Sequence, residues 1–482
     1  MNFDILIIGG GPAGITLAKH LSDKIKIGII EKGDLKYTNK RNLNDYGYCT
    51  KYGNYPFENY ATNFSSVNYF GGNSIVWSGW SMPFDENEVS SWPISYGELN
   101  KYYRDTEKFL KLKSFEELNT ENNEEYKNFE TNDWKINSWQ FVKEKDFNRF
   151  SKTFGNNVKI LLKSEFKKFY FEKNQVEGVV IDTPKEKNLI IKSKYIVLAQ
   201  GGLQSTKSLL LCERDQKVDM GNENGHLGKF YMEHPHINLG FFYDNNKVIR
   251  NKFSKKNFKL EGLFLKNPYS EKIMNGCITF NNESLLLNKD ALRLLYMLRV
   301  KRFPKNILLN YDSYNFIKNL IKGTCNLIIE KIKKKKFIYA RFEQKPNFRS
   351  YMEIDKNNKI NLNWDISETD IDSFIKITNK VKNYIKNKIS EDVYIDDAIY
   401  DKQNWHDKFK PIVLGIGHHM GTTMMSSNNK IGVVNENLQL HYRHNVFICS
   451  SSVFPTGGVA HPTFTICALA IRLADFLSRK FS

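Results

Sequence analysis

Three histidines toward the C-terminal end of the chain stand in a setting suited to proton transfer. His418 and His419 follow Gly417, and His461 precedes Pro462. The imidazole pKa of about 6.5 suits a group that accepts a hydroxyl proton near neutral pH, and two rings facing one alkoxide would divide this work. Two alternatives stay open. In the first, each ring caps a loop or pairs with a buried carbonyl. In the second, the rings bind zinc, although no cysteine or carboxylate stands at ligand spacing beside His418 and His419.

The N-terminal stretch has the pattern of a strand, a glycine turn and a helix. The apolar, β-branched residues 4–8 predict a strand buried on both faces of a parallel sheet, and residues 13–21 have helical periodicity. Between them Gly9, Gly11 and Gly14 form G-x-G-x-x-G. Such glycines serve a tight turn, the close approach of a pyrophosphate and helix-on-strand packing, and the helix N-terminus offers free N–H groups to phosphate.

Glu31 adds to the evidence for a nucleotide site. It ends a second apolar run, residues 25–30, at about the separation from the glycines at which an acidic residue accepts from ribose hydroxyls. The combination favours a dinucleotide site over an unspecialised glycine-rich loop. Residues 195–202 repeat the strand and the glycines before a predicted helix at 204–211, but without the full fingerprint, so one such site is predicted.

Further elements are predicted between these regions. Residues 69–84 combine glycines with aromatic side chains, which indicates either a close backbone approach to a ligand or a plain turn between strands. A helix is expected at 99–112 with Ser95 as its cap, and residues 113–150 are expected to form a polar surface excursion. The other predicted elements are strands at 158–162, 166–171 and 176–181, a mixed strand-and-helix region from 237 to about 410, and an apolar helix at 468–477.

Composition limits the size, partners and compartment of the protein. With 482 residues, 41% of them hydrophobic, the chain can form two domains or one large α/β domain with an attached part. The net charge of +18 comes mainly from lysines scattered among asparagines and isoleucines, which favours solvated faces over a nucleic-acid surface. The six cysteines form no C-x-x-C pair, no apolar run reaches about 18 residues, and a strand from residue 4 leaves no room for a signal peptide. We therefore expect a reducing cytoplasm.

One basic segment has two interpretations. Residues 316–336 pair apolar positions with a closing lysine run. A surface helix with a charged end is the favoured interpretation. The alternative is a peripheral contact with an anionic membrane.

The motifs together resemble those of the glucose–methanol–choline (GMC) oxidoreductases, a family of flavoenzymes that oxidise alcohols. In chain order the resemblance is carried by GGGPAG with Glu31, GGNSIVWSGWSMPF, VLAQGGLQSTKSLL, GHLGKFYMEHPH, FEQKPN, GHHMGTTMM and SSVFPTGGVAHPTFTICALAIRLADFL. The order of these motifs along the whole chain makes the resemblance specific. The internal details resemble the bacterial, pyranose-oxidase-like branch more than the glucose oxidase branch.

The resemblance implies an α/β fold with two units. One is a Rossmann-like FAD-binding domain that is discontinuous in sequence, made of residues 1–85, 155–236 and 412–482. The other is a mixed sheet-and-helix substrate or cap domain, made of residues 86–154 and 237–411.

The resemblance also implies the site residues. His418 matches the family's catalytic histidine, and His461 matches a second active-site position that is asparagine or histidine in the family. The implied FAD contacts are Gly9, Gly11 and Gly14 at the pyrophosphate, Glu31 at the ribose, Gly71, Gly72, Asn73 and Ser74 beside the isoalloxazine, Val158 near the adenine, and Ser450, Pro462 and Thr463 from the C-terminal segment.

Three positions depart from the family's pattern. Val76 stands before Trp77 where enzymes with covalent flavin have histidine, which implies an FAD that is not covalently attached. Ser450 occupies a place where many members carry aspartate, which weakens the assignment of that contact. Met425 replaces the more usual arginine-methionine ending of the His-x-x-Gly-Thr motif.

These features predict an FAD-dependent enzyme that oxidises a CH–OH group, of a sugar or sugar-derived molecule, to a carbonyl. His418 would take the hydroxyl proton while a hydride passes to flavin N5, and His461 would hydrogen-bond the developing alkoxide. The electron acceptor is oxygen, a quinone or a protein. Two rival functions stay open: a lyase without net redox, like the hydroxynitrile lyases of this family, and a non-catalytic flavin-binding partner protein, against which the retention of both histidines argues.

Overall fold

The first sheet is built around the predicted N-terminal strand. The computed structural model describes residues 1–21, 23–37, 46–50, 67–249, 253, 258–281, 334–408, 413–415 and 417–481. Within these residues the sheet has eight strands, of which five run parallel in the order β19-β9-β1-β2-β6. Their bounds are β1 (Asn2–Ile8), β2 (Ile27–Ile30), β6 (Val158–Leu161), β9 (Leu189–Leu198) and β19 (Arg443–Ile448). Antiparallel strands extend it, namely β7 (Glu165–Glu172), β8 (Gln175–Asp182) and β18 (Gln439–Leu440).

The parallel register brings the carboxyl ends of the central strands together. Ile8 of β1 aligns with Ile30 of β2 on one side and with Leu198 of β9 on the other. All three side chains are fully buried or nearly so, as expected for strands covered on both faces. Ligands of open parallel sheets bind outside these carboxyl ends, where the glycine turn of this chain lies.

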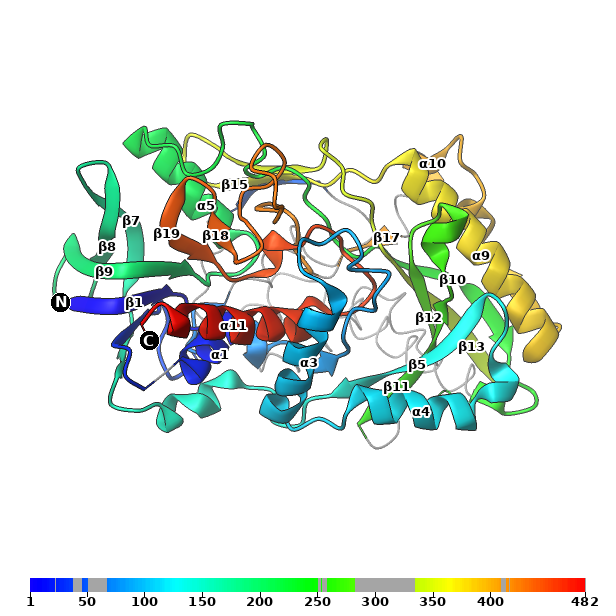
Figure 1. The fold of residues 1–482 in the computed structure, drawn as a ribbon. Helices are drawn as coiled ribbons and strands as arrows, with labels where there is room; N and C mark the ends of the chain where they lie inside the picture. Colours follow the sequence, from blue (N-terminus) through cyan, green and yellow to red (C-terminus); the bar gives the residue numbers. More distant parts are fainter. Residues whose placement is uncertain are drawn as a thin grey trace, which may run out of the picture.

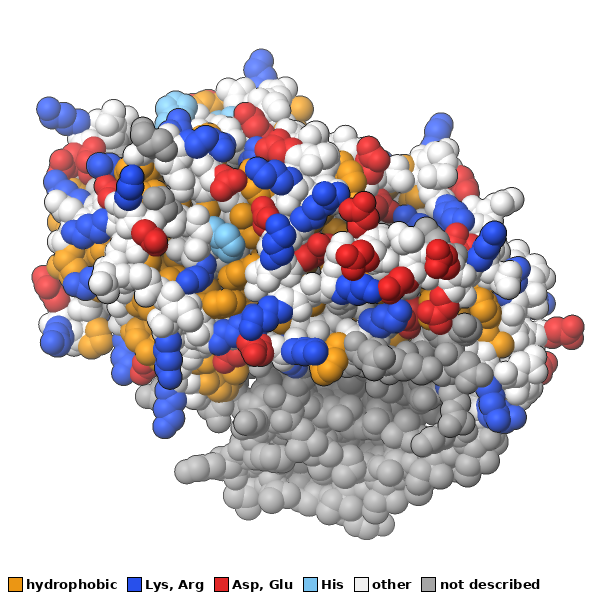
Figure 2. Space-filling view, turned by 60° about the horizontal axis from the view of Figure 1, so that its bottom comes forward, with side chains coloured by type: hydrophobic (Ala, Val, Ile, Leu, Met, Phe, Trp, Pro, Cys, Tyr) orange, Lys and Arg blue, Asp and Glu red, His pale blue; other side chains and the backbone are white. Residues whose placement is uncertain are grey.

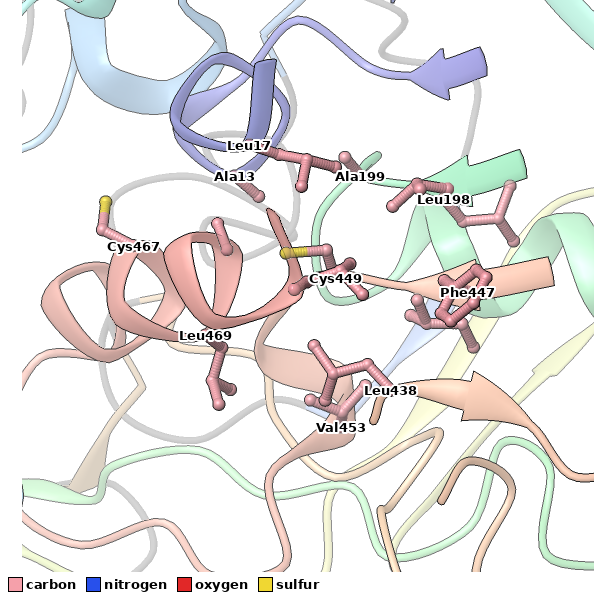
Figure 3. Packing of buried hydrophobic residues seen from close by; sticks show 14 of the residues in the cluster. Ala13, Leu17, Leu198, Ala199, Leu438, Phe447, Cys449, Val453, Cys467 and Leu469 are labelled. Atoms are coloured by element: carbon pink, nitrogen blue, oxygen red, sulfur yellow. The ribbon is translucent and has the colours of Figure 1, made fainter. Parts of the chain in front are cut away.

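Helices α1 (Pro12–His20) and α11 (Pro462–Arg479) pack side by side against this sheet (Figure 1). Figure 3 shows Ala13 and Leu17 of α1 and Leu469 of α11 around the ends of β9 and β19. The hydroxyl of Thr16 lies 3.5 Å from the sulfur of Cys467, which joins the two helices directly. Helix α3 (Tyr96–Leu110) also packs on α11, where Tyr103 stacks on Phe464, and α5 (Gln204–Leu211) follows β9.

The second sheet lies at the far end of the molecule (Figure 1). Among the described residues it also has eight strands, in the order β16-β10-β13-β12-β11-β5-β4, with β17 paired to β10. Their bounds are β4 (Trp80–Ser81), β5 (Trp134–Phe141), β10 (His236–Tyr243), β11 (Lys259–Leu265), β12 (Gly276–Asn281), β13 (Lys335–Phe342), β16 (Val393–Ile395) and β17 (Val413–Leu414). Helix α9 (Glu368–Lys388) covers it, with Phe374 stacked on Phe342 at 4.4 Å between ring centroids.

The remaining elements are small. A third sheet, in the described part of the chain, joins β14 (Tyr351–Ile354), β15 (Ile360–Asn363) and β3 (Tyr46–Cys49). Two further helices are α4 (Phe115–Glu125) and α10 (Trp405–Lys408). The first sheet takes its strands from the three segments predicted for the cofactor domain, whereas β4 and β17, from the edges of those segments, belong to the second sheet.

Most of the predicted elements are confirmed. The α/β class with a Rossmann-like parallel unit and a mixed second unit is observed, and the glycine turn lies between β1 and α1. Helix α3 begins three residues earlier than predicted and carries the predicted cap, because the Ser95 hydroxyl accepts from the N–H of Glu98. The predicted helix at 204–211 is α5, and the predicted C-terminal helix begins earlier, at Pro462.

The prediction for residues 113–150 was wrong. They contain α4 and β5, and Trp134 and Trp139 of β5 are fully buried in the second sheet. Asparagines and acidic residues interrupt the apolar pattern of this region and masked the apolar positions of β5. One of them, Asn122 of α4, is itself buried, and its amide donates to the hydroxyl of Ser138 in β5.

Residues 316–333 of the basic segment at 316–336 lie outside the described residues. Its last lysines, Lys335 and Lys336, open strand β13 and do not end a helix. No helix in the described part of the chain is long and apolar enough to cross a membrane. On the face shown in Figure 2, lysine and arginine side chains are interspersed with aspartate and glutamate.

Candidate active site

One cavity joins the N-terminal glycine turn to the C-terminal histidines. It has a volume of about 1070 Å³ and lies at the carboxyl ends of β1, β2 and β9. Its wall includes Gly9, Gly11 and Glu31 at one part and His418 and His461 at another. Residues from the two ends of the chain therefore face the same space, as the predicted transfer of a proton and a hydride requires.

The glycine turn leaves open space in front of α1. A Cβ atom on Gly9, whose φ is +110°, would lie 2.5 Å from the carbonyl oxygen of Ala199, and one on Gly14 would lie 2.1 Å from the carbonyl oxygen of Gly9. These two glycines permit close packing of the turn on β9 and of α1 on β1. Gly11 differs, because the nearest heavy atom to its Cβ position is the Cα of Gly72 at 4.0 Å. The space beside Gly11 opens into the cavity, where the N-terminus of α1 favours an anion.

Glu31 is held in place by backbone donors on both of its carboxylate oxygens. Gly10 donates its N–H to Oε2 at 2.8 Å, and Gly33 donates to Oε1 at 2.6 Å. Burial raises the pKa of Glu31 to about 7, although these two hydrogen bonds act in the opposite direction. Each carboxylate oxygen has a second lone pair, so Glu31 can still accept from a ligand hydroxyl in the cavity.

Residues 71–74 meet the glycine turn through their backbone. The N–H of Gly71 donates to the carbonyl of Gly10 at 2.6 Å, and a Cβ on Gly72 would lie 2.9 Å from the Cα of Gly11. Gly72 and Asn73 line the cavity. Gly71 and Ser74 shape the loop, because the Ser74 hydroxyl donates to the carbonyl of Gly71 and accepts from the N–H of Phe147.

The C-terminal residues that the resemblance implies as FAD contacts line the cavity, whereas Val158 does not. Ser450, Pro462 and Thr463 all line the cavity, the last two at the N-terminus of α11. Val158 begins β6 and aligns with Ile27 at the start of β2, so it lies at the amino end of the parallel strands, away from the cavity. The prediction for Val158 needs correction. The adjoining wall beyond β6 is formed instead by Ser164, whose N–H donates to the carbonyl of Glu31.

The predicted catalytic histidines lie next to each other. The ring centroids of His418 and His461 are 4.7 Å apart, and the rings meet edge to face. Trp80 packs on His461 with ring centroids 5.0 Å apart. His419 points elsewhere, since its Nδ1 lies 2.8 Å from the hydroxyl of Tyr231. His418 and His461 are thus adjacent imidazoles that both line the cavity.

Arg341 supplies a buried positive charge behind this pair. Its guanidinium donates to the carbonyl of Val459 at 2.9 Å and to Nε2 of His236 at 3.2 Å, and it lies 3.2 and 3.3 Å from the two ring nitrogens of His461. A neutral imidazole has one lone-pair nitrogen, so one of the His461 contacts is a hydrogen bond at any time. Among the described residues Arg341 forms no ion pair with a carboxylate.

Burial and this charge keep the neighbouring imidazoles neutral. Burial first, and then the charge of Arg341, lowers the pKa of His461 and His236 well below the usual range. The pKa of His418 is also held well below its usual range, by burial, by His234 and by Arg341. An unprotonated imidazole is the form that can accept a proton.

Glu233 and His234, which the sequence analysis did not single out, hold the catalytic loop. The fully buried carboxylate of Glu233 accepts from the backbone N–H groups of Gly417, His418 and His234 at 2.9, 2.7 and 3.1 Å. His234 lies 2.8 Å from His418 between their Nδ1 atoms. Both residues belong to the motif GHLGKFYMEHPH, in which they stand between the apolar residues 230–232 and a proline, and this was the available signal.

Comparisons with known proteins support the GMC oxidoreductase family for this chain. Residues 346–470 match the family model described as GMC oxidoreductase. A 2-methyl-1,2-propanediol dehydrogenase from Mycolicibacterium austroafricanum is 43% identical over 65 residues, which cover 14% of this chain and only 12% of that protein.

The similar solved structures show the fold over the full length. A formate oxidase has a TM-score of 0.64 and 15% identity, with 100% of this chain and 98% of that chain covered. A pyridoxine 4-oxidase from Mesorbium loti has a TM-score of 0.61 and 13% identity, with 98% and 99% covered. At these identities the likeness concerns the arrangement of the elements.

Proposed function

We propose that this chain, as a GMC-type oxidoreductase, binds FAD and oxidises a CH–OH group to a carbonyl with His418 as the base. The observation that carries the proposal is the single cavity lined both by the glycine turn and Glu31 and by His418 and His461. A nucleotide site alone or a histidine pair alone would fit several functions. Their union in one space fits a redox cofactor placed against a proton acceptor.

The residues present fit the nucleotide part of FAD. The open space beside Gly11 and the N-terminus of α1 would take the pyrophosphate, and Glu31 would accept from ribose hydroxyls. Gly72 and Asn73 would lie along the flavin. Ser450, Pro462 and Thr463, from the C-terminal segment, would contact the cofactor as well. When bound, the flavin supplies a hydride acceptor.

The chain's own residues would handle the proton and exclude water. His418 would accept the hydroxyl proton, and His461, held by Arg341 and Trp80, would donate a hydrogen bond to the oxygen as negative charge develops. Arg341 would stabilise that charge at longer range, because it is buried among neutral rings. The aromatic side chains Trp77 and Trp80 line the same space and reduce its contact with water.

The substrate proposed from the pyranose-oxidase-like features is a sugar or a sugar-derived molecule. The electron acceptor would be oxygen, a quinone or a protein. Anaerobic mixing of the purified yellow protein with a panel of sugars and alcohols tests the proposal, because a substrate bleaches the flavin absorbance. Cleavage of a substrate without bleaching would favour the lyase, and no reaction with any compound would favour a non-catalytic flavin protein.

Flavin reduction should be insensitive to mild acid. Because burial and neighbouring charges lower the pKa of His418, the ring stays neutral where a solvated histidine, with a pKa of about 6.5, becomes protonated. We expect the rate of flavin reduction at saturating substrate to stay constant from about pH 8 to about pH 6. Anaerobic stopped-flow measurements across this range would contradict the expectation if the rate halved near the ordinary histidine pKa.

The flavin should leave the protein on denaturation. Val76 lines the cavity at the position where members with covalent flavin have histidine, and its side chain cannot form that bond. We expect acid or detergent to release all of the flavin into the soluble fraction. Flavin absorbance that stays with the precipitated chain would show a covalent link through another residue.

A further inference from the structure

His234 makes two hydrogen-bond contacts, one with each ring nitrogen. It is fully buried in the segment before β10. Its Nε2 lies 3.0 Å from the carbonyl oxygen of Gly457, and its Nδ1 lies 2.8 Å from Nδ1 of His418. The rings of His234 and His418 are nearly perpendicular, at 87°.

The proton positions follow from the Gly457 contact. A carbonyl oxygen only accepts, so Nε2 of His234 carries a proton. Burial and the charge of Arg341 lower the pKa of His234 to about 3, so the ring is neutral and has one N–H. Its Nδ1 is therefore a lone-pair acceptor. The contact at 2.8 Å then requires that Nδ1 of His418 is the donor.

We propose that His234 is a positioning residue that fixes the Nδ1–H tautomer of His418 and so leaves Nε2 of His418 unprotonated toward the substrate. The inference rests on the proposed function, in which His418 is the base. In that reaction the substrate O–H bond would break and its proton would go to Nε2 of His418, while the carbon that bears the hydroxyl would lose a hydride to the flavin that the proposed function supplies. The resulting imidazolium still donates from Nδ1 to His234, which stabilises it through a charge-assisted hydrogen bond.

Glu233 makes the contact between the two rings rigid. One carboxylate accepts from the backbone N–H groups of both His234 and His418, so the two histidines cannot separate without breaking buried hydrogen bonds. The other charged or titratable groups packed around the pair are Arg341, His236, His461 and His419. The hydrogen-bond contacts of His419 with Tyr231, and of Arg341 with His236 and His461, involve other atoms than Nδ1 of His418.

Two variants of His234 in the FAD-loaded protein test the assignment. His234→Leu removes the acceptor for His418 Nδ1–H, whereas His234→Asn places an amide oxygen close to the position of the lost Nδ1. We expect the leucine variant to keep its FAD and to reduce flavin about 100 times more slowly, since a misplaced catalytic group costs about this much. The asparagine variant should recover most of the lost rate.

The tautomer itself can be read without a substrate. In protein labelled with ¹⁵N-histidine, long-range ¹H–¹⁵N spectra distinguish the two tautomers, and the signals of His418 are those lost in His418→Gln. We expect Nδ1–H for His418 in the wild type and in His234→Asn, and Nε2–H or a mixture in His234→Leu. Nε2–H in the wild type, or a wild-type rate in His234→Leu, would overturn the proposal.

The two readouts separate this inference from the proposed function. If no alcohol reduces the flavin but the spectra show Nδ1–H, the proposed reaction fails while the tautomer assignment holds. If His234→Leu does not fold, the wild-type spectrum still decides the assignment.

Discussion

Replacing His418 with alanine should slow flavin reduction by at least about 100-fold while FAD stays bound, because general-base help is worth about 10² to 10⁴ in rate. The side chain lines the cavity together with the glycine turn and Glu31, and its backbone is held by Glu233 independently of the ring. Anaerobic stopped-flow with a substrate identified in the screen measures the rate, and the ratio of flavin to protein absorbance measures the bound cofactor.

The control for this variant is a histidine outside the site. His444 is exposed on β19 and does not line the cavity, so His444→Ala should reduce flavin at the wild-type rate. An unchanged rate in His418→Ala would remove His418 from the role of base. Loss of FAD together with the rate would mean that the ring is needed for cofactor binding, and the kinetic result would then carry no weight.

Replacing Gly9 with alanine should cost the protein both stability and cofactor. The residue has a φ of +110°, and its Cβ would lie 2.5 Å from the backbone oxygen of Ala199. Backbone strain of this kind costs about 1–3 kcal/mol and overpacking a similar amount, so we expect the free energy of unfolding to fall by about 2–6 kcal/mol. The turn that we propose for the pyrophosphate would shift at the same time. Denaturant titration and the flavin content of the purified protein measure the two effects.

A matched glycine separates the two causes. Gly225 also has a positive φ, +70°, but no heavy atom lies within 4 Å of its Cβ position. Gly225→Ala should therefore show only the conformational cost, about 1–2 kcal/mol, with full FAD content. Equal losses in the two variants would show that close packing of the glycine turn on β9 is not the source of the effect.

The parts of the fold with local signals could be predicted from the sequence. Strand β1 and helix α1 follow from a β-branched run, three glycines and helical periodicity, and Ser95 follows from its capping chemistry. Strand β5 could not be recognised in the same way. Its alternating apolar positions stand among asparagines and acidic residues, and the partner strand β11 that buries Trp139 lies far away in the sequence.

The residues of the site also differ in whether a local signal in the sequence indicates them. His418 and His461 were found because their residue type and glycine- or proline-rich setting indicate proton chemistry. The contribution of Arg341 depends on β13 passing behind His461, and that of His234 depends on a carbonyl at Gly457. Val158 was misplaced for a related reason, because the motif gives the strand but not which end of it faces the cavity.

The way the cavity is assembled also limits which segments of this chain recombination can exchange with other proteins. Its wall combines residues 8–13 with residues 461–466, and neither stretch alone encloses a ligand. Genetic recombination that moves one uninterrupted block from such a gene therefore carries away half of a binding site. Transplanting the cofactor module to another protein requires at least the two ends of the chain to move together.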